Sequence, residues 1–446
     1  MGCAYVLSLM HRAILLFSLL TVPDLAAEDS MSYLDNGKIK VGIDLKLGGA
    51  ITFLARDSGE NIINNFDYGR QVQMSFYSGP VPFVSGYKKP AKHWEHLGWN
   101  PVQTGDDFKH GSRVIEHRND GRSLYVKCVP QQWPLDDVPG DCAFESWLEL
   151  DGIIVKARAR LNNARMDKTR YPARLQELPA VYANAPFHRV VSYLGDKPFT
   201  SAAISDVPKP QGKHPWSHWH GTEHWSALLD DTDFGLGLIT PGRIQFTGGF
   251  AGQPGPSDTH ATHTGYLAGQ GLEVLDHDIV YEYRYELVAG SLAEIRERAR
   301  AHQSKALPSW TFQSDRQGWH FNNANDSGWP IQGEVHLKLE QNDPQFISPA
   351  TFWHAGQAPF VIIEAAIHSR QTNATIFWQR LKERSPTSSV NVPVKSDGEF
   401  HRYVIKLADS PDYKGAIIGL RLDPVGNGSA DEWCKIRSIK LAKSAE

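Results

Sequence analysis

Short segments in which apolar and polar residues alternate run through most of the chain, from Met31 to about Val288. The clearest of these segments are residues 38–45, 123–129, 146–150, 153–161 and 279–288. A period of two places successive side chains on opposite faces of a β-strand. Gly, Asn, Asp and Pro separate the segments, as they do between the strands of a sandwich. Strands do not alternate with helices and no glycine-rich phosphate loop occurs, so the pattern predicts an all-β fold and no cofactor.

One helix interrupts this pattern. Ser291 and Glu294 form the sequence signature of a capping box, and Ile295 and Ala299 follow on one helical face. We therefore expect a helix over residues 292–302. The polar, proline-containing stretch 304–309 has the composition of a linker. The sequence thus predicts a first domain over residues 30–303 and a smaller β-sandwich over residues 310–446.

The second part again has the pattern of strands. The expected strands are residues 360–367, 375–378, 401–407, 416–422 and 436–441. Four tryptophans of this part either form a sugar-binding face or fill the core, since large aromatic side chains serve both purposes. They are Trp319, Trp329, Trp353 and Trp378.

The N-terminus resembles an export signal. His11 and Arg12 precede the apolar run 13–20, and small residues follow at positions 26–27. We expect residues 1–27 to be a signal peptide and the mature protein to be exported, either periplasmic or secreted. No later apolar run reaches the length of a membrane span, so no membrane insertion is expected. The net charge of −4, with no Lys/Arg-rich run, excludes nucleic acid as an expected partner. Cys128 and Cys142 are candidates for a disulfide in an oxidising compartment.

Residues 214–225 are the strongest candidate for an active site. Four histidines, three tryptophans and Glu223 fall within these twelve residues. Imidazole and carboxylate groups are costly to bury unless they are paired, whereas a sugar site uses aromatic rings for stacking and His or Glu for proton transfer. An extended backbone would place His214, Trp216, His218 and His220 on one face. A strand end with satisfied histidines and a zinc site are the alternatives. No Cys or acidic ligand has the usual spacing, so no metal is predicted.

Residues 35–54 and 61–70 resemble the opening of galactose-mutarotase-like proteins, with a Gly-Gly-Ala-Ile turn and a following loop that contains Asn and Arg. Residues 273–288 resemble the end of such a domain. The resemblance covers roughly residues 30 to 300 and implies a β-supersandwich with a concave, sugar-binding face. The superfamily includes aldose 1-epimerases, glycoside hydrolases and domains of polysaccharide lyases. Residues 419–424 resemble part of a carbohydrate-binding-module type of sandwich.

Glu177 lies between apolar residues and prolines, where partial desolvation would raise its pKa, as a general acid requires. A structural ion pair with Arg170 or Arg174 is the alternative. Glycoside hydrolysis commonly uses two carboxylates, so Glu177 and Glu223 form the expected catalytic pair, with His218 and His220 beside them. Further residues are expected to bind substrate because they are aromatic, or because their amide, carboxylate or guanidinium groups suit sugar hydroxyls. They are Asp67, Arg70, Gln73, Tyr77, Trp94, Trp99, Tyr182, Trp216, Trp219, His224 and Trp225.

Three functions are compatible with these residues. The first is an exported glycoside hydrolase acting on a poly- or oligosaccharide. The second is a polysaccharide lyase, in which Arg70 neutralises a uronate and a Tyr or His removes a proton. The basic stretch 156–174 mildly favours such an anionic substrate. The third is a sugar-binding protein without catalysis.

Overall fold

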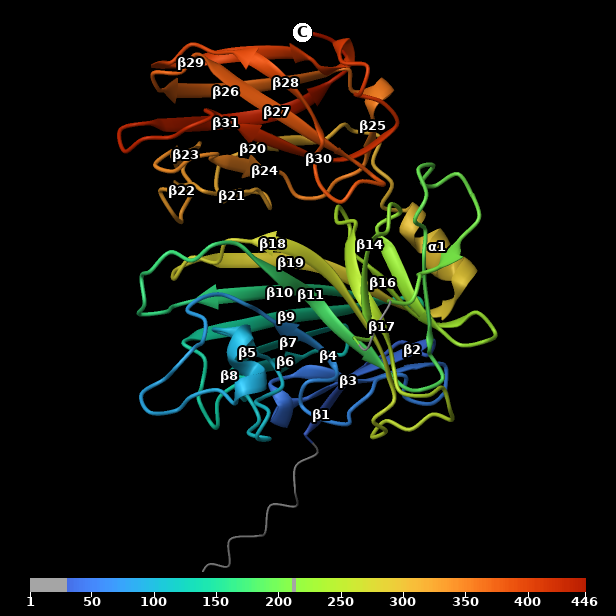
Figure 1. The fold of residues 1–446 in the computed structure, drawn as a ribbon. Coiled ribbons are helices and arrows are strands. Elements are labelled where there is room, and N and C mark those ends of the chain that lie inside the picture. The colour runs from blue at the N-terminus through green and yellow to red at the C-terminus, as the bar shows by residue number, and fades with distance from the viewer. Residues whose placement is uncertain (1–29, 211–213) are drawn as a thin grey trace, which may run out of the picture.

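The computed structural model of the protein describes residues 30–210 and 214–446, so the expected signal peptide lies outside the described residues. Figure 1 shows two layered β units stacked on one another, with the C-terminal unit in orange and red above the rest. Strands before residue 292 build the first two sheets, and strands after residue 308 build the other two. The all-β fold class is therefore confirmed.

The first sheet carries the candidate site. Its main path runs β1 (Met31–Asp35), β2 (Ile39–Asp44), β3 (Ala50–Arg56), β4 (Val72–Ser75), β11 (Arg174–Ala183), β18 (Thr264–Glu273), β17 (Gln245–Ala251) and β14 (Trp216–His220). Two short strands, β5 (Pro101–Val102) and β8 (Gln131–Gln132), extend from β4. All pairings between these strands are antiparallel.

The second sheet packs behind the first. Its order is β13 (Ser205–Asp206), β12 (Arg189–Ser192), β15 (Trp225–Leu229), β16 (Phe234–Ile239), β19 (Val280–Ser291), β10 (Ile154–Asn163), β9 (Cys142–Asp151), β7 (Ser123–Val129) and β6 (Arg113–Asn119). One large apolar core, which includes Leu54, Val181, Leu267 and Leu287, contains side chains of both sheets. Burial of this core holds the first sheet in place.

The helix α1 (Leu292–Arg300) follows β19 directly. The expected capping box is present, because the Ser291 hydroxyl accepts from the Glu294 backbone and the Glu294 carboxylate accepts from the Ser291 backbone. Ile295 and Ala299 face a smaller core that contains Trp225. The helical prediction is confirmed, and α1 ends two residues earlier than expected.

The C-terminal unit contains two further sheets. One contains β22 (Asn325–Asp326), β23 (Val335–Lys338), β31 (Trp433–Ala442), β26 (Phe360–His368) and β29 (Asp397–Lys406), with β20 (Ser309–Thr311) beside β31. The other contains β21 (His320–Asn322), β24 (Gln345–Ile347), β30 (Ala416–Asp423), β27 (Asn373–Arg380) and β28 (Ser388–Pro393), with β25 (Trp353–His354) beside β30. Trp319, Trp353 and Trp378 are buried in the core between these sheets, so they do not form a sugar-binding face.

Two details of the chain complete the fold. Cys128, Cys142 and Cys434 are buried free thiols, so the expected disulfide between Cys128 and Cys142 is wrong. Cys128 lies opposite Phe144 in the β7–β9 pairing, which places Cys142 two residues further along β9. Within the described ranges, no helix is long and apolar enough to cross a membrane.

Candidate active site

The register of the first sheet brings Glu177 into line with polar residues of its neighbours. Glu177 on β11 lies opposite Ser75 on β4 and opposite Gln270 on β18. Residues directly opposite each other in an antiparallel pair project from the same face of the sheet. The register shifts between Glu177 and Ala180, and such irregularities are common beside active sites because they redirect side chains.

A cavity of about 320 Å³, here called the site cavity, opens on this face. Strands β4, β11 and β14 and the loops around residues 67–70, 94–107 and 133 contribute its walls. Its lining residues include Asp67, Arg70, Gln73, Ser75, Tyr77, Trp94, Asn100, Asp107, Trp133, Glu177, Tyr182 and Trp216. Aromatic rings together with a few convergent polar groups are typical of a small-ligand site.

Glu177 is held by neutral donors. The Tyr77 hydroxyl donates to its Oε2 at 2.9 Å, and the Tyr266 hydroxyl donates to its Oε1. Burial raises the pKa of Glu177, and the hydrogen bonds from Tyr266 and Tyr77 oppose this effect. The structural alternative for Glu177 does not apply, because Arg174 instead donates to backbone carbonyls of residues 96 and 97. Among the residues that the structure describes, Glu177 therefore has no cationic partner, and it is partly accessible from the site cavity.

The tyrosines around Glu177 are neutral phenols at physiological pH. Burial raises the pKa of Tyr77, Tyr182 and Tyr266, and the nearby Glu177 carboxylate raises each of them further. The rings of Tyr182 and Tyr266 lie 4.7 Å apart, and Trp216 lies 4.8 Å from Tyr266. These three rings form an aromatic wall beside Glu177.

The His/Trp segment divides between the two faces of β14. Trp216, His218 and His220 share the face of Glu177, as the alternation predicted, and Trp216 lines the site cavity. The His218 ring forms a hydrogen bond of 3.1 Å with Gln270, the residue that lies opposite Glu177 on β18. Neither His218 nor His220 lines the site cavity. Trp219 points to the opposite face, where it stacks on Phe246 in the core, so its predicted sugar contact is wrong.

Glu223 does not belong to the site cavity, which corrects the expected Glu177–Glu223 pair. Its carboxylate is completely buried and accepts two hydrogen bonds from Arg296 of α1, at 2.8 and 2.9 Å. It also accepts from the Trp225 indole and from the Phe199 backbone. Trp225 is fully buried beside it and cannot contact a ligand. His224 lines a different cavity, near residues 303–308, and its ring accepts from the Gly242 backbone.

Asp67 and Arg70 stand together at the rim of the site cavity. Their side chains form an ion pair of 3.3 Å, and Arg70 also donates to the Thr262 carbonyl at 2.7 Å. Burial raises the pKa of Asp67, and the charge of Arg70 opposes this effect. Gln73 also lines the cavity, although its amide is engaged with Thr104 and with the Tyr68 carbonyl. The structure thus brings these predicted residues to the same cavity as Glu177.

The loop after β4 contributes one of its two predicted tryptophans. The Trp94 indole donates to Asp107 at 2.7 Å and lines the cavity, together with Trp133. Trp99 is completely buried and donates to Asp141, so its predicted role in substrate binding is wrong. Sequence reasoning missed Tyr266, Trp133 and Asp107, because only the strand register and the loop packing bring them to Glu177.

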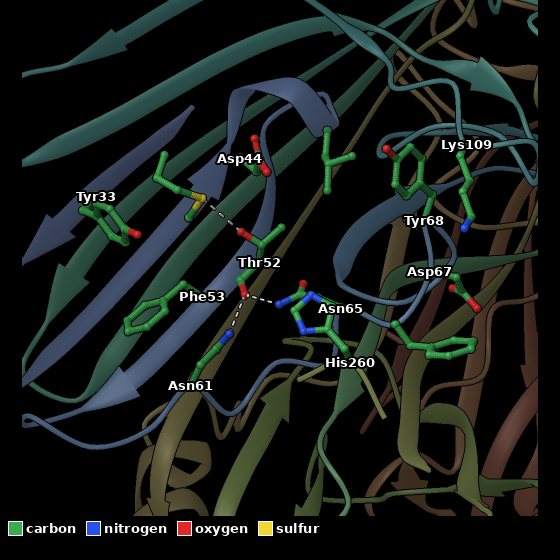
Figure 2. Close-up of a pocket in the computed structure, with 13 residues that line it drawn as sticks. Tyr33, Asp44, Thr52, Phe53, Asn61, Asn65, Asp67, Tyr68, Lys109 and His260 are labelled. Carbon is green, nitrogen blue, oxygen red and sulfur yellow. Dashed lines mark hydrogen bonds between the residues drawn. The ribbon is translucent and has the colours of Figure 1, made fainter. Parts of the chain in front are cut away.

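A second cavity of about 500 Å³ adjoins the first, since Asp67 lines both. Figure 2 shows it between β1–β3 and the loop that bears Asn65 and Tyr68. The side-chain amides of Asn61 and Asn65 both donate to the Thr52 carbonyl, at 2.8 and 2.9 Å. These hydrogen bonds fix the loop that carries Asp67. Among residues 30–210 and 214–446, no group of three or more His, Cys, Asp or Glu is arranged to hold a metal.

No protein-family model and no curated protein matches the chain. Solved structures that it matches include a galactose mutarotase-like protein from Lactobacillus casei, at 11% identity over 58% of this chain and 99% of that chain, with a TM-score of 0.37. An α-galactosidase from Geobacillus stearothermophilus matches at 11% identity over 60% of this chain and 40% of that chain, with a TM-score of 0.33. A polysaccharide lyase matches at 11% identity over 86% and 46%, with a TM-score of 0.34.

The structures that this chain resembles thus include galactose-mutarotase-like proteins, the group that residues 35–70 resemble in sequence. At such identities and TM-scores, these likenesses carry no argument about a substrate or a reaction.

Proposed function

We propose that the protein is a carbohydrate-active enzyme in which Glu177 transfers a proton to a sugar bound in the site cavity. The observation that carries the proposal is the environment of Glu177: its pKa is raised by burial, its hydrogen-bond donors are neutral, and aromatic rings line the cavity that it reaches. A carboxyl group that stays protonated towards neutral pH can act as a general acid, while aromatic faces stack on pyranose rings.

Cleavage of a glycosidic linkage by hydrolysis is the reaction that this arrangement favours. Glu177 would protonate the leaving oxygen. Asp67, which forms an ion pair with Arg70, would be the second carboxylate, a role that the sequence had assigned to Glu223. Trp94, Trp133 and Trp216 would hold the sugar by stacking.

A polysaccharide lyase is the second candidate, because Arg70 and the tyrosines line the same cavity. A lyase needs a base to remove a proton. The raised pKa values of Tyr77 and Tyr182 keep both phenols protonated in the absence of substrate, which disfavours them as bases. Hydrolysis therefore stands ahead of β-elimination.

The test is to incubate the purified protein with a panel of neutral and uronate-containing polysaccharides and to follow new reducing ends and ultraviolet absorbance. Hydrolysis yields reducing ends alone, whereas β-elimination also yields an absorbing unsaturated uronate. Glu177→Gln should lower turnover at least about a hundredfold while the thermal melting temperature is kept. Near-normal turnover in this variant, or binding with no product from any substrate, would contradict the proposal.

We also propose a role for each segment of the chain. Residues 1–27 would direct export, residues 30–303 would form the catalytic domain, and residues 310–446 an accessory sandwich. N-terminal sequencing of protein recovered from outside the cytoplasm should give a mature start near Glu28. Recovery of the uncleaved chain from the cytoplasm would contradict export.

A further inference from the structure

The polar row that contains Glu177 continues across the first sheet beyond the site cavity. Gln270 lies opposite Glu177, and Gln245 lies opposite His220 in the pairing of β17 with β14. Strands β18 and β17 are neighbours, and their pairing begins one residue from Gln245 and Gln270. The row therefore leads from Glu177 over β18 and β17 to β14. Three inter-strand spacings separate its ends, which is about 14 Å.

The C-terminal unit lies over the far end of this row. A cleft of about 840 Å³ separates the two units and has His220, Gln245 and Gln270 on its first wall. In Figure 1 β18 crosses the top of the first unit, and β21 and β24 of the C-terminal unit lie above it. The opposite wall includes His320, Asn322, Gln345, Arg384 and Arg421.

Two polar groups of the cleft, on Arg384 and His320, have no charged or hydrogen-bonding partner among the residues that the structure describes. Arg421 pairs with Asp423 and Asp343, but Arg384 is exposed and forms no ion pair within the described residues. His320 is only 6% exposed, and its Nδ1 has no hydrogen-bond partner among them. A buried polar atom without a partner is costly, so such an atom at the wall of a cleft indicates a place for a ligand or for ordered water.

Buried ion pairs join the two units. Arg316 of the C-terminal unit bonds to Asp276 of the first unit at 2.8 Å and to Asp326 of its own unit at 2.5 Å. All three side chains are at most 5% exposed. Arg170 adds hydrogen bonds to the carbonyls of Asp326 and Ser327. The cleft is thus preformed, so a ligand would bind there without first ordering its walls.

We propose that this cleft is an extended saccharide-binding site, in which an oligosaccharide whose reacting end lies at Glu177 continues along the polar row and between the two units. The inference rests on the proposed function and deepens it, because it says where the sugars beyond the reacting one are bound. Amide, imidazole and guanidinium groups are suitable partners for the hydroxyl groups of such a chain. His220, from the His/Trp segment, thereby contacts the distal part of the ligand.

The test compares the affinity of the full-length protein for short and long members of four series: xylo-, cello-, alginate and galacturonate oligosaccharides. Glu177→Gln serves as the parent, so that the probes are not consumed during the titration. Gln245→Ala and Arg384→Ala, made in this parent, alter one wall each. Lys382→Ala is the matched control, since Lys382 is an exposed cation of the same loop that does not line the cleft.

The parent should bind the long members of at least one series more tightly than the disaccharide. Gln245→Ala and Arg384→Ala should each weaken the long members about tenfold, leaving the disaccharide unchanged. Lys382→Ala should match the parent, and all variants should keep the melting temperature of the parent. Affinity independent of chain length, equal affinity of parent and cleft variants, or no binding of any series would overturn the inference.

Failure of the proposed function would have a separate signature. In that case the wild type and Glu177→Gln form product at the same rate, or neither forms any, whereas the initial binding of the probes, recorded before appreciable turnover, still depends on chain length and on Arg384.

Discussion

Glu177 and Glu223 were both expected to take part in catalysis, but the fold places them in different surroundings. Glu177 is bonded by the hydroxyls of Tyr77 and Tyr266 and reaches a cavity with aromatic walls. Glu223 is bonded by the guanidinium of Arg296, by an indole and by a backbone amide, and it is completely buried.

The two glutamates differ in their hydrogen-bond partners and in their accessibility to a ligand. A guanidinium fork holds a carboxylate in a fixed position, and a completely buried carboxylate cannot contact a ligand. Neutral donors leave the cost of desolvation largely uncompensated, so the pKa of Glu177 is raised while the group stays accessible. The comparison assigns a structural role to Glu223 and a chemical role to Glu177.

The largest expected effect is a loss of stability when Glu223 is replaced. Glu223→Gln should lower the free energy of unfolding by about 3–5 kcal/mol, because Arg296 is then buried without its counter-charge. Urea denaturation measures this change. Glu297→Gln is the control, since the exposed pair of Glu297 with Arg300 should contribute less than about 1 kcal/mol. Equal losses in the two variants would contradict a structural role for Glu223.

A smaller effect comes from His224, next to Glu223. Burial lowers the pKa of His224 to about 4, while in the unfolded chain it has its ordinary value of 6.5. The unfolded state therefore binds more protons between these values, and the free energy of unfolding falls as pH drops from about 6.5 to about 4. This contribution should amount to at most about 3 kcal/mol.

Urea denaturation at several pH values measures this loss. His224→Asn should reduce the pH dependence, because Asn tolerates the positive φ of 64° at this position and does not titrate in this range. An unchanged pH dependence in His224→Asn would show that other groups cause the loss.

The smallest expected effect is a shift in the pKa of Glu177. Tyr266→Phe removes a hydrogen bond that lowers the pKa of Glu177, so that pKa should rise further. If Glu177 is the general acid, the alkaline limb of kcat/KM moves to higher pH in this variant. A pH–rate profile of Tyr266→Phe against wild type measures the shift, and a shift to lower pH would contradict the account.

Much of the fold could be predicted because its causes are local. The period of two marked β7 and β10 in almost their full length, and the capping box at Ser291 gave the start of α1. Within the site, Glu177 and Trp216 could be selected from their immediate neighbours in the chain. Alternation along β14 also separates Trp216 from Trp219, although the density of aromatic residues favoured a role for both.

The errors concern contacts between distant parts of the chain. Arg296 lies on a helix 73 residues after Glu223, and no local pattern connects the two. Tyr266 reaches Glu177 only through the register of β11 and β18, which depends on the packing of the whole sandwich. The burial of Trp99 and Trp225 depends on packing in the same way.

The measurement that tests the central claim most directly is turnover per folded molecule for Glu177→Gln and Glu223→Gln on the same polysaccharide, with thermal melting recorded for both. We expect Glu177→Gln to melt at the same temperature as the wild type and to have at least about a hundredfold lower turnover. We expect Glu223→Gln to melt at a lower temperature. At temperatures where this variant is folded, its turnover should be within a few-fold of that of the wild type. The reverse pattern, with Glu223→Gln inactive when folded and Glu177→Gln active, would contradict the central claim.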